Sequence, residues 1–277
     1  MQLGVQGLNA KAAAAPDVTV KLARLAEDLG YGSWWALDHL VLPSGPDAPP
    51  YAGMPVVEPL VHLAHVAAVT SRIELGTAVV ILPQRNPVVL AKQAASVDVL
   101  SGGRLLLGVG SGWLEAEMSA VGVPMAERGA RSDEYLDAMT ALWTADAPAF
   151  AGRFVAFADV DARPRPVRPG GPPVHVGGRS PGAYRRAVRR AHGFYGTGTV
   201  AEMAADLAGL RRAADEVERP ARLGPLEITA MPTTAVDRAT ADRYAELGVD
   251  RLVVHALPLD DPDDVARFLA AHASLAG

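Results

Sequence analysis

The chain has 277 residues, enough for one large domain or for two average ones. Its composition, 49% apolar and 21% charged, excludes a disordered chain. The net charge of −5 disfavours a nucleic-acid partner, because phosphate binding needs a surplus of basic residues, and the absence of cysteine excludes disulfides, zinc fingers and a thiol nucleophile.

Short β-branched segments alternate with longer segments of helical periodicity along the chain. Strands are predicted at residues 2–6, 33–37, 73–80, 104–109, 174–176, 194–195, 227–230 and 251–255. Helices are predicted at residues 17–29, 58–70, 87–100, 115–120, 127–144, 181–191, 199–218, 237–247 and 262–275. Eight strand–helix pairs favour a closed parallel barrel over an open sheet. The sequence therefore predicts an α/β fold, a single (β/α)8 TIM barrel domain over residues 1–277.

Two segments rich in proline and glycine interrupt this rhythm. Residues 43–55 form a loop long enough to be a lid. Residues 147–173 are expected to form an excursion on the barrel rim, with a short strand at 154–157. Both are interpreted as rim insertions of the barrel.

No targeting or membrane-spanning segment is predicted. Met1 leads directly into Leu3 and Val5 without a basic region, and the apolar stretches are interrupted by polar residues before they reach membrane-spanning length. The cytoplasm is the expected location. The expected partner is a small-molecule substrate, with no nucleic acid and no membrane, and the choice between a monomer and a homodimer stays open.

The carboxyl ends of the strands are where a barrel of this class carries its active site. The segments that follow the predicted strands are therefore the candidates: Asp38-His39, Thr77-Ala78-Val79, Gly108–Trp113, Gly177–Pro181 and Gly196–Gly198.

His39 is the histidine that stands at a strand end beside a charged residue. Imidazole titrates near neutrality, so His39 is either a catalytic acid–base or a polar spacer on the rim. His175 and His255 lie inside predicted strands, and one of them is expected to line the barrel. The spacing of the histidines does not indicate a metal site.

Two glycine-rich segments could bring the backbone close to a ligand. Gly177 and Gly178 precede Arg179 and Ser180, with Ser180 as a helix N-cap before Pro181. A helix N-terminus with an arginine and a hydroxyl favours phosphate binding, although an ordinary tight turn has the same pattern. Gly110, Ser111 and Gly112 mark either a second close approach or a sharp turn, and Trp113 either stacks on a cofactor or packs in the core.

Several segments together resemble the luciferase-like monooxygenase superfamily, and within it the branch of F420-dependent oxidoreductases. The similarity runs from Met1 to about Gly198, and the last third of the chain matches only in its strand–helix rhythm. The segments that carry the resemblance are Leu29–Trp34, Asp38–Pro43, Ile73–Val79, Asn86-Pro87, Lys92–Ala94, Ser101–Arg104, Gly108–Leu114, Glu127–Arg131 and Pro173–Gly178.

The resemblance implies a flavin or deazaflavin in the mouth of the barrel. It also implies a bulge with a non-prolyl cis peptide within Thr77-Ala78-Val79, expected between Ala78 and Val79. Asp38 and His39 match the family's pair beside the ring. Ser111, Gly112 and residues 177–180 match the segments that hold the cofactor's chain and phosphate.

One departure concerns the F420-dependent sugar-phosphate dehydrogenases of this family. They carry a glutamate at the position of Trp113 and a tryptophan near Pro43, and this chain has neither. The departure argues against sugar-phosphate oxidation and leaves His39 as the expected proton-transfer group.

The first interpretation is an F420-dependent oxidoreductase that exchanges a hydride with an organic substrate lying under residues 43–55. His39 would supply or remove the proton, and Asp38 would orient His39 or contact the ring. The acidic tail of F420 favours a basic groove, which Arg179, Arg185 and Arg186 could line.

Other interpretations keep the barrel and change its chemistry. The second is an FMN-dependent monooxygenase that uses reduced flavin and O2. The third is a flavin-binding or ligand-binding barrel without turnover. A barrel aldolase or isomerase is disfavoured, because the three lysines do not stand at strand ends.

Overall fold

The computed structural model describes residues 1–44, 48, 52–257 and 259–275. The loop predicted at residues 43–55 therefore lies partly outside the described residues.

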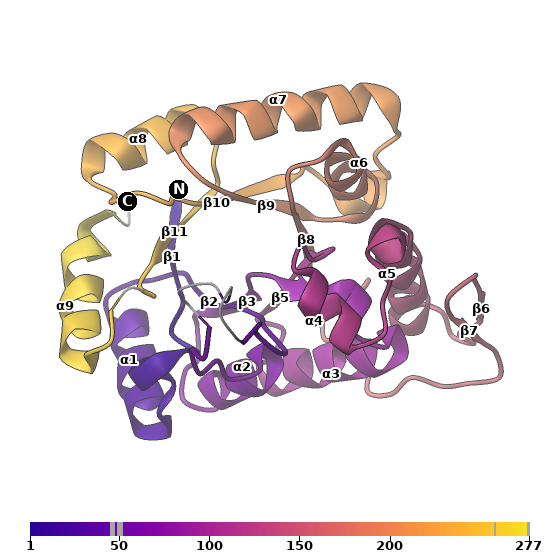
Figure 1. Ribbon diagram of the computed structural model, residues 1–277, viewed down its shortest axis with the longest axis horizontal. Helices are drawn as coiled ribbons and strands as arrows, with labels where there is room; N and C mark the ends of the chain where they lie inside the picture. The colour runs from indigo at the N-terminus through magenta and orange to yellow at the C-terminus, as the bar shows by residue number, and fades with distance from the viewer. Residues whose placement is uncertain (45–47, 49–51, 258, 276–277) are drawn as a thin grey trace.

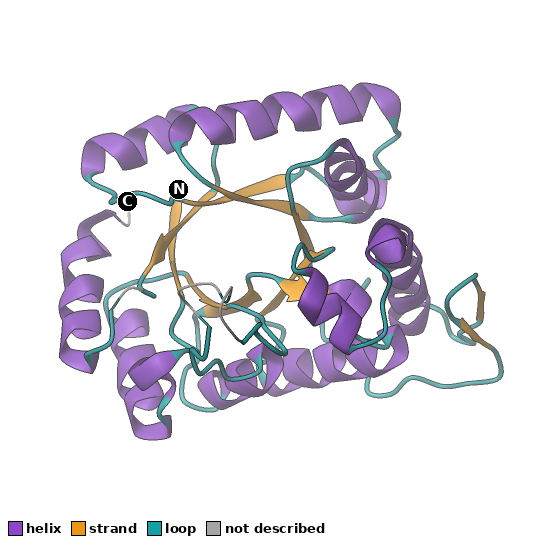
Figure 2. Ribbon diagram, in the orientation of Figure 1, coloured by secondary structure: helices purple, strands orange, loops and turns teal. Residues whose placement is uncertain are grey.

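The described part of the chain forms a closed barrel of eight parallel strands, the third of which is divided into β3 and β4 (Figures 1 and 2). β1 pairs with β2 and with β11, and β3 also pairs with β5, which closes the ring. The (β/α)8 prediction is confirmed. The strands are β1 (Gln2–Gln6), β2 (Ser33–Ala36), β3 (Glu74–Thr77), β4 (Val80–Ile81), β5 (Leu105–Gly110), β8 (Val174–Gly177), β9 (Gly193–Thr197), β10 (Glu227–Met231) and β11 (Arg251–His255).

Helices surround the barrel and lie close to their predicted positions (Figure 2). They are α1 (Pro16–Asp28), α2 (Pro59–Ala67), α3 (Pro87–Leu100), α4 (Glu115–Ala120), α5 (Arg128–Thr144), α6 (Pro181–Arg190), α7 (Val200–Glu216), α8 (Arg238–Glu246) and α9 (Pro262–His272). Capping side chains determine where several of these helices begin. At the start of α3, the side chain of Asn86 accepts hydrogen bonds from Val88 N and Val89 N, and Pro87 is the first helical residue. None of the helices among the described residues is long and apolar enough to cross a membrane.

The third barrel strand is broken by a bulge. The Ala78–Val79 peptide bond between β3 and β4 is cis, as the family resemblance implied. After it, β4 resumes parallel pairing with β5, with Val80 opposite Val109.

The excursion between α5 and β8 contains more structure than expected. It carries a two-stranded antiparallel hairpin, β6 (Phe150–Ala151) and β7 (Ala156–Phe157), where one strand was predicted. Figure 1 shows the hairpin projecting from the barrel beyond α5 and α3.

The interior of the barrel is filled by one tryptophan and the side chains around it. Trp35 is fully buried and packs with Leu106, Tyr195 and Val253. A side chain on Gly76 has no room, because its Cβ would lie 2.2 Å from the Trp35 ring. Alternate residues of each strand face this interior, so the barrel is a packed core with its opening at the strand ends.

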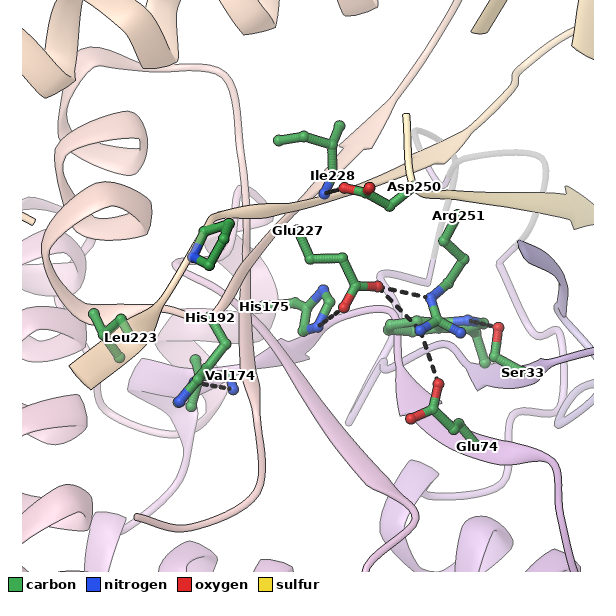
Figure 3. A network of polar contacts seen from close by, with 12 residues as sticks. Ser33, Glu74, Val174, His175, His192, Leu223, Glu227, Ile228, Asp250 and Arg251 are labelled. Atoms are coloured by element: carbon green, nitrogen blue, oxygen red, sulfur yellow. Dashed lines mark hydrogen bonds and ion pairs between the residues drawn. The ribbon is translucent and has the colours of Figure 1, made fainter. Parts of the chain in front are cut away.

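A network of charged side chains lies where β3, β10 and β11 begin, at the opposite end of the barrel from the carboxyl ends of the strands. Figure 3 shows these side chains. Arg251 donates hydrogen bonds to Glu74 at 2.8 Å and to Glu227 at 3.0 Å. His175 is fully buried, edge-on to Trp35, and burial lowers the pKa of its imidazole to about 3. His175 therefore lines the barrel as a neutral ring.

Candidate active site

A cavity of about 480 Å³ opens where the carboxyl ends of the strands meet. All predicted site residues belong to the described part of the chain, and all but Asp38, His39 and Thr77 line this cavity. The lining comes from the bulge, the loop after β5, the β8–α6 turn and β9: Ala78, Val79, Ile81, Gly110, Ser111, Gly112, Trp113, Arg128, Gly177, Gly178, Arg179, Ser180, Phe194, Tyr195, Gly196 and Thr197.

Glycines at the inner wall make room for the bulge. A Cβ on Gly110 would lie 2.7 Å from Val79 Cγ2, and one on Gly177 would lie 3.3 Å from Val79 Cγ1. A Cβ on Gly108 would lie 1.8 Å from the carbonyl oxygen of Thr77. Thr77 is buried behind the cavity, and its hydroxyl donates a hydrogen bond to Gly108 O at 2.6 Å. The glycine pattern therefore serves the packing of Val79 as well as the approach of a ligand.

Two buried side chains support the bulge from beneath. The Tyr195 hydroxyl donates a hydrogen bond to Gln6 Oε1. Gln6 Nε2 in turn lies 3.5 Å from the carbonyl oxygen of Ala78. Burial raises the pKa of Tyr195, so its hydroxyl stays protonated and remains a donor. The β9 strand thus contacts the bulge through Gln6.

Asp38 holds the strand that follows the bulge. Its Oδ2 accepts hydrogen bonds from Ile81 N and from Arg85 Nη1, both at 2.9 Å, and its Oδ1 accepts one from Arg85 Nη2 at 3.0 Å. Arg85 also binds Glu58 at 2.9 Å. Burial lowers the pKa of Arg85, but the two carboxylates more than offset this and raise it, so the guanidinium is charged. Both carboxylate oxygens of Asp38 therefore accept hydrogen bonds from Arg85 and Ile81, while its expected role of orienting His39 or contacting the cofactor ring stays a prediction.

Glu117 is the carboxylate that faces His39. It is 2% exposed, and its Oε2 lies 3.5 Å from His39 Nδ1 while its Oε1 accepts a hydrogen bond from Leu40 N at 2.6 Å. Burial raises the pKa of Glu117, but its interactions with the side chains of His39 and Gln84 and with the backbone of Leu40 outweigh burial and lower it. Glu117 is therefore ionised, and its carboxylate contacts both the backbone N–H of Leu40 and the ring of His39 in the loop after β2.

The turn between β8 and α6 has the predicted helix cap. The Ser180 hydroxyl accepts a hydrogen bond from Ala183 N at 3.2 Å, and Pro181 is the first helical residue. Gly178 has a φ of 124°, which only glycine adopts readily. On the facing side, Ser111 Oγ lies 2.9 Å from Ser132 Oγ. This arrangement presents backbone N–H groups and hydroxyls to the cavity, which are groups that bind phosphate.

The three arginines expected to line a basic groove are each ion-paired. Arg179 binds Glu202 at 2.8 Å and Asp206 at 3.2 Å, both on α7. Arg185 pairs with Glu216, and Arg186 is buried against Asp133. Neighbouring helices thus supply a carboxylate for each of these arginines, and a basic groove for an acidic cofactor tail stays a prediction.

A second cavity, of about 560 Å³, lies at the β2 loop. The described residues that line it are His39, Leu40, Val41, Leu42, Pro43, Ser44, Ala48, Ala52, Gly53, Met54 and Val56. The predicted residues thus divide between two neighbouring regions, with His39 in the second. The link between them is short: Asp38, next to His39, bonds to Ile81, which lines the first cavity.

The model of the luciferase-like monooxygenase family matches residues 2–274. The chain belongs to this family. A protein of Mycobacterium tuberculosis without an assigned function is 34% identical over 257 residues, which cover 89% of each chain. The FMNH2-dependent dimethylsulfone monooxygenase of Pseudomonas putida is 30% identical over 209 residues, which cover 74% of this chain and 53% of that protein.

A solved structure shows the same fold at much lower identity. The F420-dependent secondary alcohol dehydrogenase in complex with an F420–acetone adduct has a TM-score of 0.81 at 14% identity, covering 99% of this chain and 97% of that one. The luciferase-like barrel is thus shared with proteins that use different cofactors.

Sequence reasoning missed two residues of this luciferase-like site, Arg85 and Glu117. Each lies far along the chain from its partner, 47 residues from Asp38 to Arg85 and 77 residues from Leu40 to Glu117. One signal was present for Glu117: it stands on the short helix that directly follows the glycine loop at a strand end.

Proposed function

We propose that this luciferase-like protein is an F420-dependent oxidoreductase, which exchanges a hydride with an organic substrate. The observation that carries the proposal is the proximity of a cavity rich in backbone donors to a histidine paired with a buried carboxylate. The cavity can accept a planar ring and a phosphate, and the histidine can move a proton.

The residues present fit a deazaflavin with a ribityl phosphate. The ring would lie against Ala78 and Val79, and the Val79 side chain is accommodated because Gly110 and Gly177 carry no Cβ. The phosphate would meet the N-terminus of α6 at Gly178 and Ser180. When bound, F420 supplies or accepts the hydride, and the protein supplies position and charge.

His39 and Glu117 provide the proton transfer in this proposal. Glu117 Oε2 lies 3.5 Å from His39 Nδ1, so this carboxylate would stabilise the ring when His39 carries a proton. His39 would supply or remove the proton that accompanies the hydride exchanged between the bound cofactor and the substrate.

A second candidate, an FMN-dependent monooxygenase, is favoured by one observation. Arg179 and Arg185 pair with carboxylates of α7, which reduces the positive charge that these two side chains could offer to the glutamyl tail of F420. FMN has no such tail. The relative from Pseudomonas putida, whose name states FMNH2 dependence, is consistent with this candidate.

Titration with each cofactor separately tests the proposal. We expect F420 to bind in the micromolar range or tighter, about −8 kcal/mol, measured by fluorescence quenching or calorimetry. Tight binding of FMN without binding of F420 would move the assignment to the monooxygenase. Failure of both to bind refutes the whole cofactor assignment.

A variant pair separates phosphate binding from helix capping. Ser180→Ala and Asp237→Ala each remove the N-cap of one helix, at a cost of about 1 kcal/mol in stability. Only Ser180 lines the cavity, so Ser180→Ala should also weaken cofactor binding by about tenfold or more. Equal affinities in the two variants would place the phosphate elsewhere.

A further inference from the structure

Two serines line the cavity at the strand ends, and they differ in the hydrogen bonds that they already make. Ser111 directly follows β5, and its Oγ lies 2.9 Å from Ser132 Oγ and 3.3 Å from Arg186 Nη1. Ser180 precedes α6, and its Oγ accepts a hydrogen bond from Ala183 N at 3.2 Å. These contacts determine which of the two hydroxyls can still donate to a ligand.

The direction of the bond between Ser111 and Ser132 follows from the number of hydrogens. The Ser132 hydroxyl donates its single hydrogen to the carbonyl oxygen of Arg128 at 2.7 Å, so Ser132 can only accept from Ser111. An arginine side chain has donors only, so Arg186 donates to the oxygen of Ser111. The hydrogen of Ser111 is therefore used within the protein, and one lone pair of its oxygen is left for a ligand.

Arg186 is held in place by more than its bond to Ser111. Its side chain is 6% exposed, Nε donates a hydrogen bond to Asp133 Oδ1 at 2.9 Å, and Nη2 donates one to the carbonyl oxygen of Gly129 at 2.9 Å. The guanidinium thus joins α6 to the first turns of α5 and to the loop after β5. The described lining of the cavity includes Ser111 but not Arg186, so Arg186 can act on a ligand only through Ser111.

Ser180 has the opposite hydrogen-bond polarity. Its oxygen accepts from Ala183 N, and among the described residues none accepts the hydrogen of its hydroxyl. A phosphate group presents oxygens that accept hydrogen bonds, so it fits the free hydrogen of Ser180 and not the lone pair of Ser111. A chain hydroxyl has a hydrogen of its own, which it can donate to Ser111.

We infer that Ser111 accepts a hydrogen bond from a hydroxyl of the cofactor's ribityl chain, and that Arg186 is the positioning residue that gives Ser111 this polarity. The inference rests on the proposed function in taking this cavity as the site of a cofactor with a ribityl phosphate, and it applies equally to F420 and to FMN. It assigns the chain to the loop after β5 and the phosphate to the start of α6.

A series of ligands tests the polarity of Ser111. FMN and riboflavin share the ring and the chain and differ in the phosphate, F420 is compared in the same way with its phosphate-free 8-hydroxy-5-deazaflavin, and lumiflavin has the ring without the chain. Ser111→Ala should weaken both members of a pair by the same factor, about fivefold or more, and leave lumiflavin unchanged. Ser180→Ala should weaken only the phosphorylated member. Fluorescence quenching measures each affinity.

The outcomes separate this inference from the proposed function. A loss in Ser111→Ala that is confined to the phosphorylated ligands, or no loss at all, overturns the inference. If the F420 pair does not bind and the flavin pair does, the proposed function fails, and the flavin pair still decides the role of Ser111. If none of these ligands binds, both fail.

A double-mutant cycle tests whether Arg186 acts through Ser111. Arg186→Met removes the guanidinium and should weaken riboflavin about as much as Ser111→Ala does, and the double variant should bind no more weakly than either single variant. Additive losses would assign Arg186 a purely structural role and overturn its part of the inference. Arg186→Lys replaces Arg186→Met if the latter does not fold, because an ammonium lacks the planar fork that reaches Ser111, Gly129 and Asp133 together.

Arg190→Met is the matched control for this cycle. Arg190 lies one turn further along α6 and pairs with Asp133, the carboxylate that also binds Arg186, and with Asp137. Its loss removes the same charge from the same helix, and we expect the affinity for riboflavin to stay within about twofold of the wild type. A loss as large as that of Arg186→Met would attribute the effect to the charge of α6 and refute the role of Arg186.

Discussion

The contact between Val79 and Gly110 gives a test of the site that needs no known substrate. A Cβ added at Gly110 would lie 2.7 Å from Val79 Cγ2, where ordinary contacts are 3.4–4 Å. One of the two groups must therefore move by about 0.7 Å, the difference between 3.4 and 2.7 Å. Overpacking of this kind costs about 1–3 kcal/mol. Gly110→Ala should lose that much free energy of unfolding, about 2–4 °C in melting temperature for each kcal/mol.

The same substitution should also weaken cofactor binding, because Val79 would be pushed toward the cavity that it lines. Val79→Ala removes Cγ2, so Gly110→Ala should cost less in that background, with a coupling energy of about 1 kcal/mol or more. Gly129→Ala is the control, since the nearest atom to its Cβ would be Arg186 Nη2 at 3.8 Å. It should be neutral or stabilising by up to about 1 kcal/mol within α5. Urea unfolding and cofactor titration measure both effects, and an equal cost of Gly110→Ala in both backgrounds would refute the reasoning.

Three further predictions concern ionisable groups. Glu117→Gln should lose about 1–3 kcal/mol of unfolding free energy at pH 7, measured in urea, because the charge facing His39 disappears. The folded pKa of Glu117 is lowered, so the wild type should lose this advantage over the variant as the pH falls below 4.5. Glu27→Gln should cost about 1–2 kcal/mol of unfolding free energy, a figure discounted because the carboxylate is only partly buried. This difference in stability should vanish as the pH falls from 4.5 to about 2, the folded pKa of Glu27. Burial lowers the pKa of His62 and of His175 from 6.5 to about 3. As the pH falls below 6.5, each histidine therefore takes up a proton in the unfolded chain but not in the folded one, which costs about 2 kcal/mol of stability per histidine at pH 5. Between pH 6.5 and 5 the slope of stability against pH should approach two protons, and a slope unchanged in His175→Gln would contradict this.

The barrel could be predicted from the sequence because its signals are local. Helix starts follow from caps and prolines, as at Asn86 and Ser180, and strands follow from β-branched segments. The division of the third strand was not visible in the sequence, because residues 73–80 have the pattern of one continuous strand on both sides of the bulge. The bulge could be predicted only from the family resemblance. The second strand of the hairpin within residues 147–173 was missed, because two-residue strands carry almost no periodic signal.

The glycine-rich parts of the site could be predicted for the same reason. Gly110 and Gly178 act through their own backbone and the adjacent turn, which the sequence displays directly. The state of the arginines could not be predicted. Whether Arg179 is a free cation or an ion-paired one depends on where α7 places Glu202 and Asp206, and that is a property of helix packing. A count of basic residues near a predicted phosphate site therefore says little about the net charge of that site.

Asp38 and His39 show why adjacency in sequence is a poor guide to partnership. Consecutive side chains of an extended chain point to opposite sides, and their contacts follow that rule. Asp38 turns toward Arg85 and Ile81 and holds the strand after the bulge, while His39 turns toward Glu117 and the second cavity. The short segment after β2 therefore serves both regions of the site, one through each side chain. Because Asp38 is anchored by three hydrogen bonds, the position of His39 is set by the same contacts that set the position of β4.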